Sequence, residues 1–161
     1  MKIGIIYFSH MGHTQKVAEN ASEALRQAGF DVDCTQLIPK EPLDLRAERV
    51  PVEEIPQVVP YDLLVLGTPV HGGRMSAPMR YFLDEMPSIK GKKILALATH
   101  FFRKGWGAVQ TIQQMQKICE IAGADFLGFV NVKWLSLFRS KQINIAVEAI
   151  LNSVRCINRE D

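Results

Sequence analysis

The chain has few cysteines, and their placement excludes two classes of protein. Its three cysteines, Cys34, Cys119 and Cys156, are odd in number and widely spaced. This pattern disfavours both a disulfide framework and a zinc site, and no other set of metal ligands is identified. We therefore expect reduced, mostly buried thiols in a cytoplasmic protein.

The chain also lacks a surplus of either charge and a long apolar run. It has 19 basic and 17 acidic side chains, a formal net charge of +2, and no Lys/Arg cluster stands out, so nucleic-acid binding is not expected. Its first strand opens at Lys2 without a long apolar segment or a cleavable leader, so we expect neither a membrane span nor a signal peptide. At 161 residues and 47% apolar, the chain fits a single globular domain, residues 1–161.

Both of the best-known nucleotide-binding loops, G-x-x-x-x-G-K-[ST] and G-x-G-x-x-G, are absent. An apolar run over residues 3–6 leads instead into a hydroxyl-rich turn, residues 7–14, and then into a helical pattern. Free backbone N–H groups at the start of such a helix form an anion site, to which Ser9 and Thr14 could add hydroxyls. No Lys or Arg lies in the turn, so only its two histidines could add charge. The same turn is also consistent with an ordinary helix cap.

The rest of the chain alternates short apolar runs with amphipathic ones, which predicts an α/β fold. We expect strands over residues 3–6, 31–36, 63–66, 94–99 and 126–132, and helices over residues 14–28, 76–86, 109–122 and 143–157. The second strand is brief and only alternately apolar, so it should lie near an edge. Mostly continuous apolar strands separated by helices indicate a parallel sheet covered on both faces.

Two segments depart from this alternation. Residues 39–60 carry five prolines, which forbid a long helix and allow at most one turn over residues 52–55. Residues 67–78, after the third strand, read Gly-Thr-Pro-Val-His-Gly-Gly-Arg-Met-Ser-Ala-Pro, with Ser76 expected to cap the next helix and Pro78 in its first turn. The unusual loops follow the first, third and fourth strands, so all three should open on the carboxyl edge of the sheet, where such folds bind ligands.

Together, Ser9-x-x-Gly12-x-Thr14 and residues 67–78 resemble the flavodoxin-like FMN proteins, and the resemblance covers the whole order of strands and helices. It implies a three-layer, doubly wound sheet of five parallel strands in the order 2-1-3-4-5, with FMN as cofactor. Two features depart from the family pattern. The Pro-rich residues 39–60 replace the regular second helix, and the usual aromatic sandwich is not obvious.

The resemblance also implies roles for the three loops. The first loop would hold the FMN phosphate, the second would lie along the isoalloxazine, and the loop from Thr99 to Gly107 would close the other side, with Phe101, Phe102 or Trp106 as the aromatic contact. The implied cofactor residues are Ser9, His10, Met11, Gly12, His13, Thr14, Thr68, Pro69, Val70, His71, Gly72, Gly73, Thr99, His100, Phe101 and Trp106. No catalytic residue beyond the flavin itself is implied.

These candidates have ordinary explanations too. His10 and His13 could be rim residues, Gly72 and Gly73 could serve only turn geometry, and the aromatic side chains could pack on their own loop. Arg103 and Lys104 could be a solvated tip or could recognise a nicotinamide dinucleotide phosphate.

Three functions remain open at this point. The first is an FMN-dependent oxidoreductase that passes electrons from NADH or NADPH to a quinone or another small acceptor. The second is an electron carrier between protein partners, with no substrate of its own. Carriers of this family tend to have acidic docking faces, which the net charge of +2 does not indicate, so the enzyme is favoured. The third is a domain that binds another phosphorylated ligand or none. The oligomeric state stays open.

Overall fold

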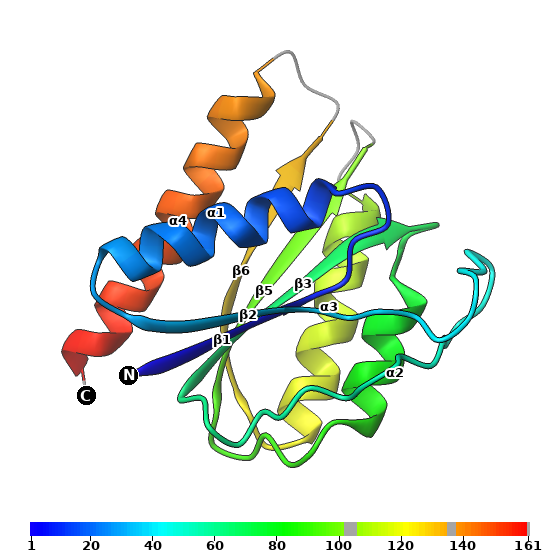
Figure 1. Cartoon of the computed structure of the whole chain (residues 1–161), viewed down its shortest axis with the longest axis horizontal. Coiled ribbons are helices and arrows are strands. Elements are labelled where there is room, and N and C mark those ends of the chain that lie inside the picture. Colours follow the sequence, from blue (N-terminus) through cyan, green and yellow to red (C-terminus); the bar gives the residue numbers. More distant parts are fainter. Residues whose placement is uncertain (102–105, 135–137, 161) are drawn as a thin grey trace.

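The computed structural model describes residues 1–101, 106–134 and 138–160, and its strands form one twisted sheet (Figure 1). The elements are β1 (Lys2–Tyr7), α1 (His13–Gln27), β2 (Asp31–Gln36), β3 (Leu63–His71), β4 (Arg74–Met75), α2 (Ala77–Glu85), β5 (Lys93–His100), α3 (Trp106–Ile121), β6 (Asp125–Lys133) and α4 (Arg139–Glu160).

The sheet order is β2-β1-β3-β5-β6, and all pairs along this path are parallel. The two-residue strand β4 lies off the path and pairs antiparallel with the end of β3. When β4 is set aside, the expected order 2-1-3-4-5 is confirmed, and β2 is an edge strand as predicted. Because β1, β3, β5 and β6 run in one direction, their carboxyl ends share one edge (Figure 1).

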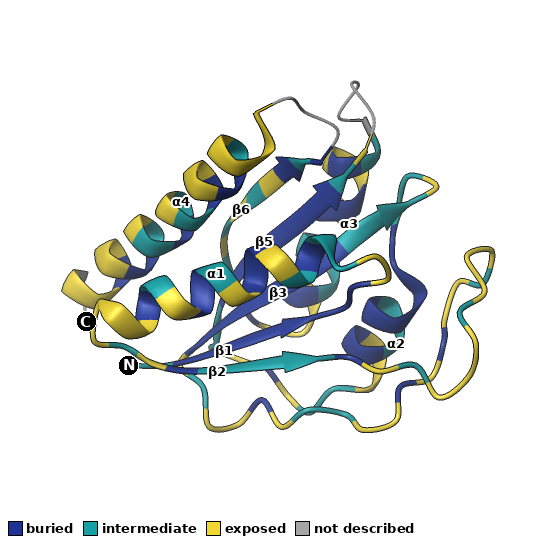
Figure 2. Cartoon of the chain, turned by 45° about the horizontal axis from the view of Figure 1, so that its top comes forward, coloured by how far each residue is buried: buried dark blue, intermediate teal, exposed yellow. Residues whose placement is uncertain are grey.

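Helices cover both faces of the sheet, as predicted. α1 and α4 pack with alternate residues of the strands, among them Ile3, Ile5 and Leu97. α2 and α3 pack with the residues that point the other way, such as Ile6 and Leu66. Figure 2 shows the central strands buried along most of their length and the outer faces of the helices exposed. The period-2 alternation of β strands therefore divides one sheet between two hydrophobic cores.

The buried face of α1 and its C-terminal end are both explained by local sequence. Val17, Ala18 and Leu25 are among the buried residues on its sheet-facing side. The helix ends in a Schellman motif, in which the Phe30 amide donates to the Leu25 carbonyl at 3.1 Å and the Gly29 amide donates to the Arg26 carbonyl at 2.9 Å. Gly29 has φ +89°, the left-handed conformation that glycine adopts without strain.

The region from β3 to α2 corrects two expectations. β3 continues to His71, five residues beyond the predicted end at residue 66, because Thr68 and Pro69 still pair with β5 and Val70 pairs with Met75 of β4. Ser76 occupies the N-cap position of α2, but its hydroxyl makes no capping bond. It lies 2.9 Å from the Thr68 hydroxyl, which also accepts the Ser76 amide at 3.0 Å. The pair therefore fastens the start of α2 to β3.

The Pro-rich segment is irregular, as expected, and the possible helical turn over residues 52–55 is wrong. Val52 instead forms an isolated antiparallel bridge with Pro39. Val50, Val52 and Val58 are buried, and the Val50 amide donates to the Ala77 carbonyl at 3.2 Å. Three valine anchors thus hold this segment against the α2 side of the sheet.

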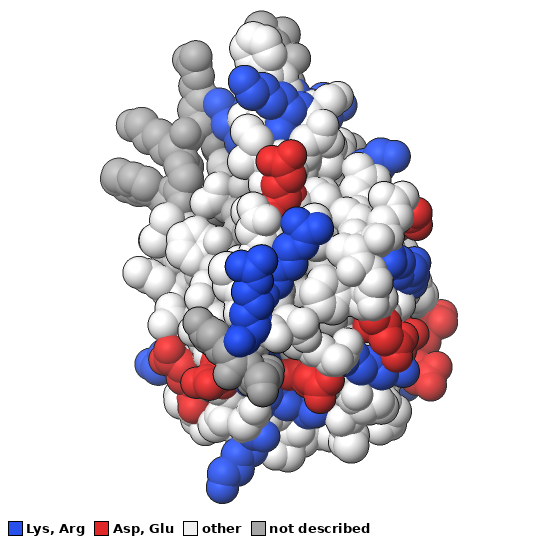
Figure 3. Space-filling view, turned by 90° about the vertical axis from the view of Figure 1, so that its left-hand side faces the viewer, with Lys and Arg blue, Asp and Glu red and all other residues white. Residues whose placement is uncertain are grey.

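The three cysteines are free, in agreement with the expectation of reduced thiols. Cys119 is buried and Cys34 is half-buried, but Cys156 is exposed on α4, so the expected burial is wrong there. In the described ranges, none of the helices has both the length and the apolar character needed to cross a bilayer. Over the end of the molecule where both termini lie, positive and negative side chains are interspersed (Figure 3).

Candidate functional site

A cavity of about 160 Å³ opens at the carboxyl edge of the sheet, where the loops after β1, β3, β5 and β6 meet. One further residue comes from the Pro-rich segment. The lining residues are Ser9, His10, Met11, His13, Thr14, Leu45, Pro69, Val70, His71, Thr99, His100, Phe101 and Trp134. The three loops that the sequence singled out therefore do converge.

Eleven of the sixteen predicted site residues line this cavity, and four of the described ones do not. Gly12, Thr68, Gly72 and Gly73 lie in the same loops but outside the cavity lining. Trp106 begins α3, but its side chain lies outside the described residues. Phe102, Arg103 and Lys104 lie wholly outside them. Of the three candidate aromatic contacts, Phe101 lies in the lining.

The first loop has the backbone geometry of an anion site. Gly12 is the N-cap of α1 and has φ +78°, and no side chain caps the helix there. A Cβ added to Gly12 would meet no atom within 4 Å, so the approach to the helix end is open. His13 and Thr14, the first two residues of α1, both line the cavity. The positive end of the α1 dipole is thus directed at this space.

Hydroxyl groups lie beside that helix end. Ser9 is 8% exposed, and its Oγ has no hydrogen-bond partner among the described residues. The hydroxyls of Thr14 and Thr99 are both buried and lie 2.8 Å apart. Only one of these two protons can serve the bond between them, so the other proton is available to a ligand. An orphaned buried hydroxyl costs folding free energy, and a bound acceptor would remove that cost.

All four histidines of the chain line the cavity. The rings of His10 and His71 are 6.5 Å apart in an edge-to-face arrangement. Burial lowers the pKa of His71, and the neighbouring His10 lowers it further. Burial also lowers the pKa of His13, with a smaller contribution from the positive charge of Arg139. His13 and His71 are therefore predominantly neutral at pH 7 and act as hydrogen-bonding groups.

An aromatic wall forms one side of the cavity. The His13 ring is stacked on the Trp134 indole, with centroids 4.1 Å apart, and meets the Phe101 ring at 5.0 Å. Arg139, the first residue of α4, lies 4.8 Å above the Trp134 ring and donates from Nε to the Trp134 carbonyl at 3.2 Å. The wall therefore joins α1, the residue after β5 and the segment between β6 and α4.

The β3–β4 hairpin borders the cavity through Val70 and His71. Its turn is Gly72-Gly73, with φ values of +56° and +80°, between the paired residues His71 and Arg74. A Cβ on Gly107 of α3 would come within 3.0 Å of both Gly73 Cα and Val70 Cγ1. The hairpin and α3 therefore approach each other so closely that a larger residue at position 107 would require one of them to shift.

Comparison with known protein families assigns the chain to one of them. A family model described as NADPH-dependent FMN reductase matches residues 1–130. The chain belongs to the NADPH-dependent FMN reductase family. Its membership agrees with the resemblance to flavodoxin-like FMN proteins found in the sequence.

Curated relatives extend the comparison at the level of sequence. The chain is 34% identical over 91 residues to an NAD(P)H dehydrogenase (quinone) of Methylocella silvestris. The aligned region covers 52% of the chain and 46% of the relative. It is 29% identical over 101 residues to an NAD(P)H dehydrogenase (quinone) of a Bradyrhizobium species. This alignment covers 58% of the chain and 51% of the relative. This member of the NADPH-dependent FMN reductase family thus spans about half the length of the curated relatives it matches.

Solved structures confirm the fold. A WrbA-like flavodoxin from Agrobacterium tumefaciens superposes with a TM-score of 0.70 at 16% identity and 99% coverage of both chains. A flavodoxin from the domain Archaea gives 0.68 at 14% identity, over 98% of this chain and 99% of the other. At such identities the likeness concerns the fold alone. The flavodoxin-like fold expected for this family member is therefore confirmed.

Two lining residues of this NADPH-dependent FMN reductase family member were missed by sequence reasoning. Trp134 follows the last predicted strand by two residues, so its position at the carboxyl edge could have been read from the sequence. Leu45 lies in the irregular Pro-rich segment, where no periodicity assigns a side chain to any face. A rule that examines the exit of every strand would have found the first residue and not the second.

Proposed function

We propose that the chain holds FMN at this edge of the sheet and passes electrons from NADH or NADPH to a quinone or another small acceptor. The observation that carries the proposal is the orphaned buried hydroxyl of Ser9 beside the uncapped N-terminus of α1. Family membership supports FMN as the anion that fits there. The names of the curated relatives, of whose length the chain spans about half, support a nicotinamide nucleotide as donor and a quinone as acceptor.

The first loop would bind the phosphate of FMN. The Ser9 hydroxyl, the amides of the first turn of α1, and whichever of Thr14 and Thr99 keeps a free proton would donate hydrogen bonds to it. His10 and His13 line the cavity beside the same turn, where their ring nitrogens would offer hydrogen bonds to the phosphate. Met11 and Gly12 complete the loop, with Gly12 leaving the helix end accessible.

The ring would lie between the hairpin and the aromatic wall. Pro69, Val70, His71, His100 and Phe101 line this part of the cavity. Thr68 fixes the start of α2, and Gly72 and Gly73 shape the hairpin turn. Trp106, at the start of α3, is proposed as a further contact. To these predicted contacts we add Leu45 and Trp134.

When bound, FMN would supply hydride and single-electron chemistry, and the protein would supply orientation and electrostatics. His71 would be neutral at pH 7 and would offer one donor and one acceptor nitrogen to the ring. The cavity of about 160 Å³ is smaller than the roughly 300–1,000 Å³ of typical ligand sites. A bound flavin would therefore reach the surface at Met11 and Leu45, which are 68% and 53% exposed, and its edge would be accessible to a donor or acceptor.

A second candidate is an electron carrier without its own substrate. One observation favours it, because the superposition covers 99% of two structures titled flavodoxin, one from the domain Archaea and one from Streptococcus pneumoniae, the latter with a TM-score of 0.69 and 17% identity. By contrast, the chain covers about half of the curated dehydrogenases. The likeness to flavodoxins supports the carrier, and the names of the curated relatives support the enzyme.

Anaerobic stopped-flow mixing separates the two functions. The FMN-loaded protein is mixed with NADPH or NADH, and flavin absorbance is followed before and after addition of a benzoquinone. Rapid bleaching, followed by reoxidation with the quinone, is the result expected for the enzyme. A flavin whose absorbance does not change with either nucleotide, but which forms a stable blue semiquinone on photoreduction, indicates the carrier. A protein that gains no flavin absorbance after incubation with FMN would contradict both.

A further inference from the structure

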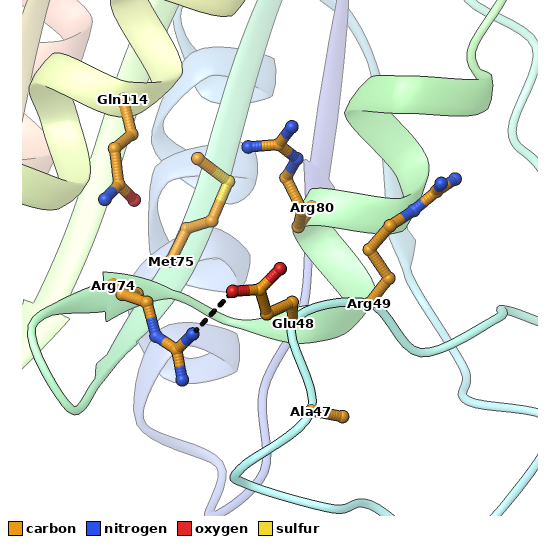
Figure 4. A pocket seen from close by; sticks show the side chains of 7 residues that line it. All are labelled: Ala47, Glu48, Arg49, Arg74, Met75, Arg80 and Gln114. Carbon is orange, nitrogen blue, oxygen red and sulfur yellow. Dashed lines mark ion pairs between the residues drawn. The ribbon is translucent and has the colours of Figure 1, made fainter.

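A second cavity, of about 250 Å³, lies among four segments of the chain and is lined by three arginines. The Pro-rich segment, β4, α2 and α3 each contribute to it (Figure 4). The lining residues, which we name the arginine cavity, are Ala47, Glu48, Arg49, Arg74, Met75, Arg80 and Gln114. Among the lining residues three arginines outnumber a single glutamate, while Asp84 and Glu85, which pair with Arg80 and Arg49, lie outside the lining.

One of the arginines is fully engaged within the protein. Arg49 contacts Asp84 from Nε at 3.1 Å and pairs with Glu85 through Nη2. Its guanidinium also lies 5.4 Å above the Tyr81 ring. Arg49 therefore serves to attach the Pro-rich segment to α2.

The other two arginines retain hydrogen-bonding capacity. Arg80 uses only Nε, which contacts the two carboxylate oxygens of Asp84 at 3.1 and 3.0 Å. Among the described residues its two terminal nitrogens have no hydrogen-bond partner. Within the described part of the chain Arg74 has a single ion pair, from Nη1 to Glu48 Oε1 at 3.6 Å, which is longer than a hydrogen bond (Figure 4). The Glu48 side chain is 86% exposed, so this pair is weak and displaceable.

Unused guanidinium donors around a cavity suit a phosphate group. A guanidinium presents its donors as a planar fork that matches phosphate oxygens, and charge-assisted bonds of this kind are the strong ones. Gln114, on the α3 side, adds an amide that has no hydrogen-bond partner in the described ranges. An incoming phosphate would take the place of the Glu48 carboxylate at Arg74.

The arginine cavity adjoins the proposed flavin site. Leu45 lines the flavin site and Ala47 lines the arginine cavity, and two residues of chain span at most about 7 Å. His71 lines the flavin site and pairs directly across the hairpin with Arg74 of the arginine cavity. One extended molecule can therefore have one end at the flavin and a phosphate at the arginines.

We propose that the arginine cavity binds a phosphate group of the nicotinamide dinucleotide whose nicotinamide ring reaches the flavin site. This inference rests on the proposed function, because it assigns the recognition of the electron donor. Arg74 and Arg80 hold the phosphate, and Glu48 competes with it for Arg74.

Isothermal titration of the FMN-loaded protein with NADP⁺ tests the assignment without turnover. Arg74→Gln and Arg80→Gln should each weaken binding about 10- to 100-fold, as expected for loss of a charge-assisted bond. Glu48→Gln should tighten binding at least twofold, a result that a merely structural role would not give. Arg155→Gln, an exposed change on α4 with the same loss of charge, should leave binding unchanged. FMN affinity and thermal unfolding of each variant show whether the fold is intact.

The outcomes separate this inference from the proposed function. If NADPH bleaches the flavin in the wild type and NADP⁺ binds equally well to the Arg74 and Arg80 variants, the inference is overturned while the enzyme stands. If NADP⁺ binding depends on both arginines but NADPH leaves the flavin oxidised, the inference stands and the proposed function fails. Absence of NADP⁺ binding to the FMN-loaded wild type overturns the inference outright.

Discussion

The imidazole of His13 lies stacked on the indole of Trp134, with ring centroids 4.1 Å apart and an interplanar angle of 22°. The two residues are far apart in the sequence, one in the first turn of α1 and the other after β6. Arg139 extends the arrangement, since its guanidinium lies over the same indole. The proposed phosphate loop is therefore held in place by a residue that follows the edge strand β6. No local sequence motif indicates this contact.

Replacing Trp134 should weaken FMN binding through His13. Trp134→Ala removes the surface on which the imidazole stacks, and we expect FMN affinity to fall about tenfold, since an aromatic pair contributes about 0.5–1.5 kcal/mol. Loss of a nearly buried Trp should also lower the free energy of unfolding by about 3 kcal/mol. Quenching of FMN fluorescence measures the affinity. Trp134→Phe keeps an aromatic face and should recover most of the binding, and equal losses in both variants would contradict stacking as the cause.

Replacing Ser9 should have opposite effects on stability and on binding. Its Oγ is buried without a partner in the described protein, so Ser9→Ala should leave the free protein unchanged or raise its free energy of unfolding by about 1 kcal/mol. The same change removes a donor to the phosphate, and FMN affinity should fall about tenfold.

The chain offers a matched control for this variant. Thr111 of α3 also has a buried hydroxyl without a partner among the described residues, and it does not line the cavity. Thr111→Val should leave FMN affinity unchanged. Chemical denaturation of the apoprotein and fluorescence titration with FMN provide the two measurements. A Ser9→Ala protein that is less stable and binds FMN normally would show that the hydroxyl has a structural role instead.

Much of the fold could be read from the sequence because its signals are local. Continuous apolar runs such as residues 63–66 and 94–99 need burial on both faces, which only a covered parallel sheet provides. Gly29 marks the end of α1 because a left-handed residue is required there. The two-residue strand β4 was missed, since no periodicity can be detected over two positions. The buried valines of the Pro-rich segment could not be identified either, because irregular backbone has no repeating face.

The site was predictable to the extent that topology determines it. Loops after β1, β3 and β5 had to share an edge, and they do. Partners across long sequence separations could not be foreseen. The Thr14–Thr99 hydrogen bond joins residues 85 positions apart, and Ser76 contacts Thr68 where a local helix cap was expected. Side-chain partners depend on distances that only the packed structure sets.

Gly67 should be required for the approach of the first loop to β3. A Cβ at this position would lie 2.8 Å from Tyr7 Cβ and 3.2 Å from Thr14 Cγ2. Gly67→Ala should therefore lower the free energy of unfolding by about 1–3 kcal/mol and, by displacing Thr14, should weaken FMN binding. Gly4→Ala is the control, because its Cβ would meet the Tyr61 ring at 2.6 Å, away from the cavity. Both variants should unfold more easily, but only Gly67→Ala should bind FMN less well.

The stability of the apoprotein should depend on pH through His71. Its pKa is lowered in the folded protein, chiefly by burial and then by His10, so the unfolded chain binds more protons below the ordinary histidine pKa of about 6.5. The contribution of His71 to the free energy of unfolding should therefore be complete above about pH 6.5. It should be lost as the pH falls towards the folded-state pKa. His13 contributes in the same direction, since its pKa is also lowered.

Denaturant unfolding of the apoprotein at pH 8, 7, 6 and 5.5 measures this dependence. The wild type should lose stability between pH 7 and 5.5, and His71→Asn should lose less, because asparagine keeps hydrogen-bonding capacity but does not titrate. The His10 ring lies 6.5 Å from the His71 ring and contributes to lowering the His71 pKa. His10→Asn removes that contribution and should also weaken the dependence of the free energy of unfolding on pH. Parallel curves for the wild type and His71→Asn would show that His71 does not cause the loss of stability in acid.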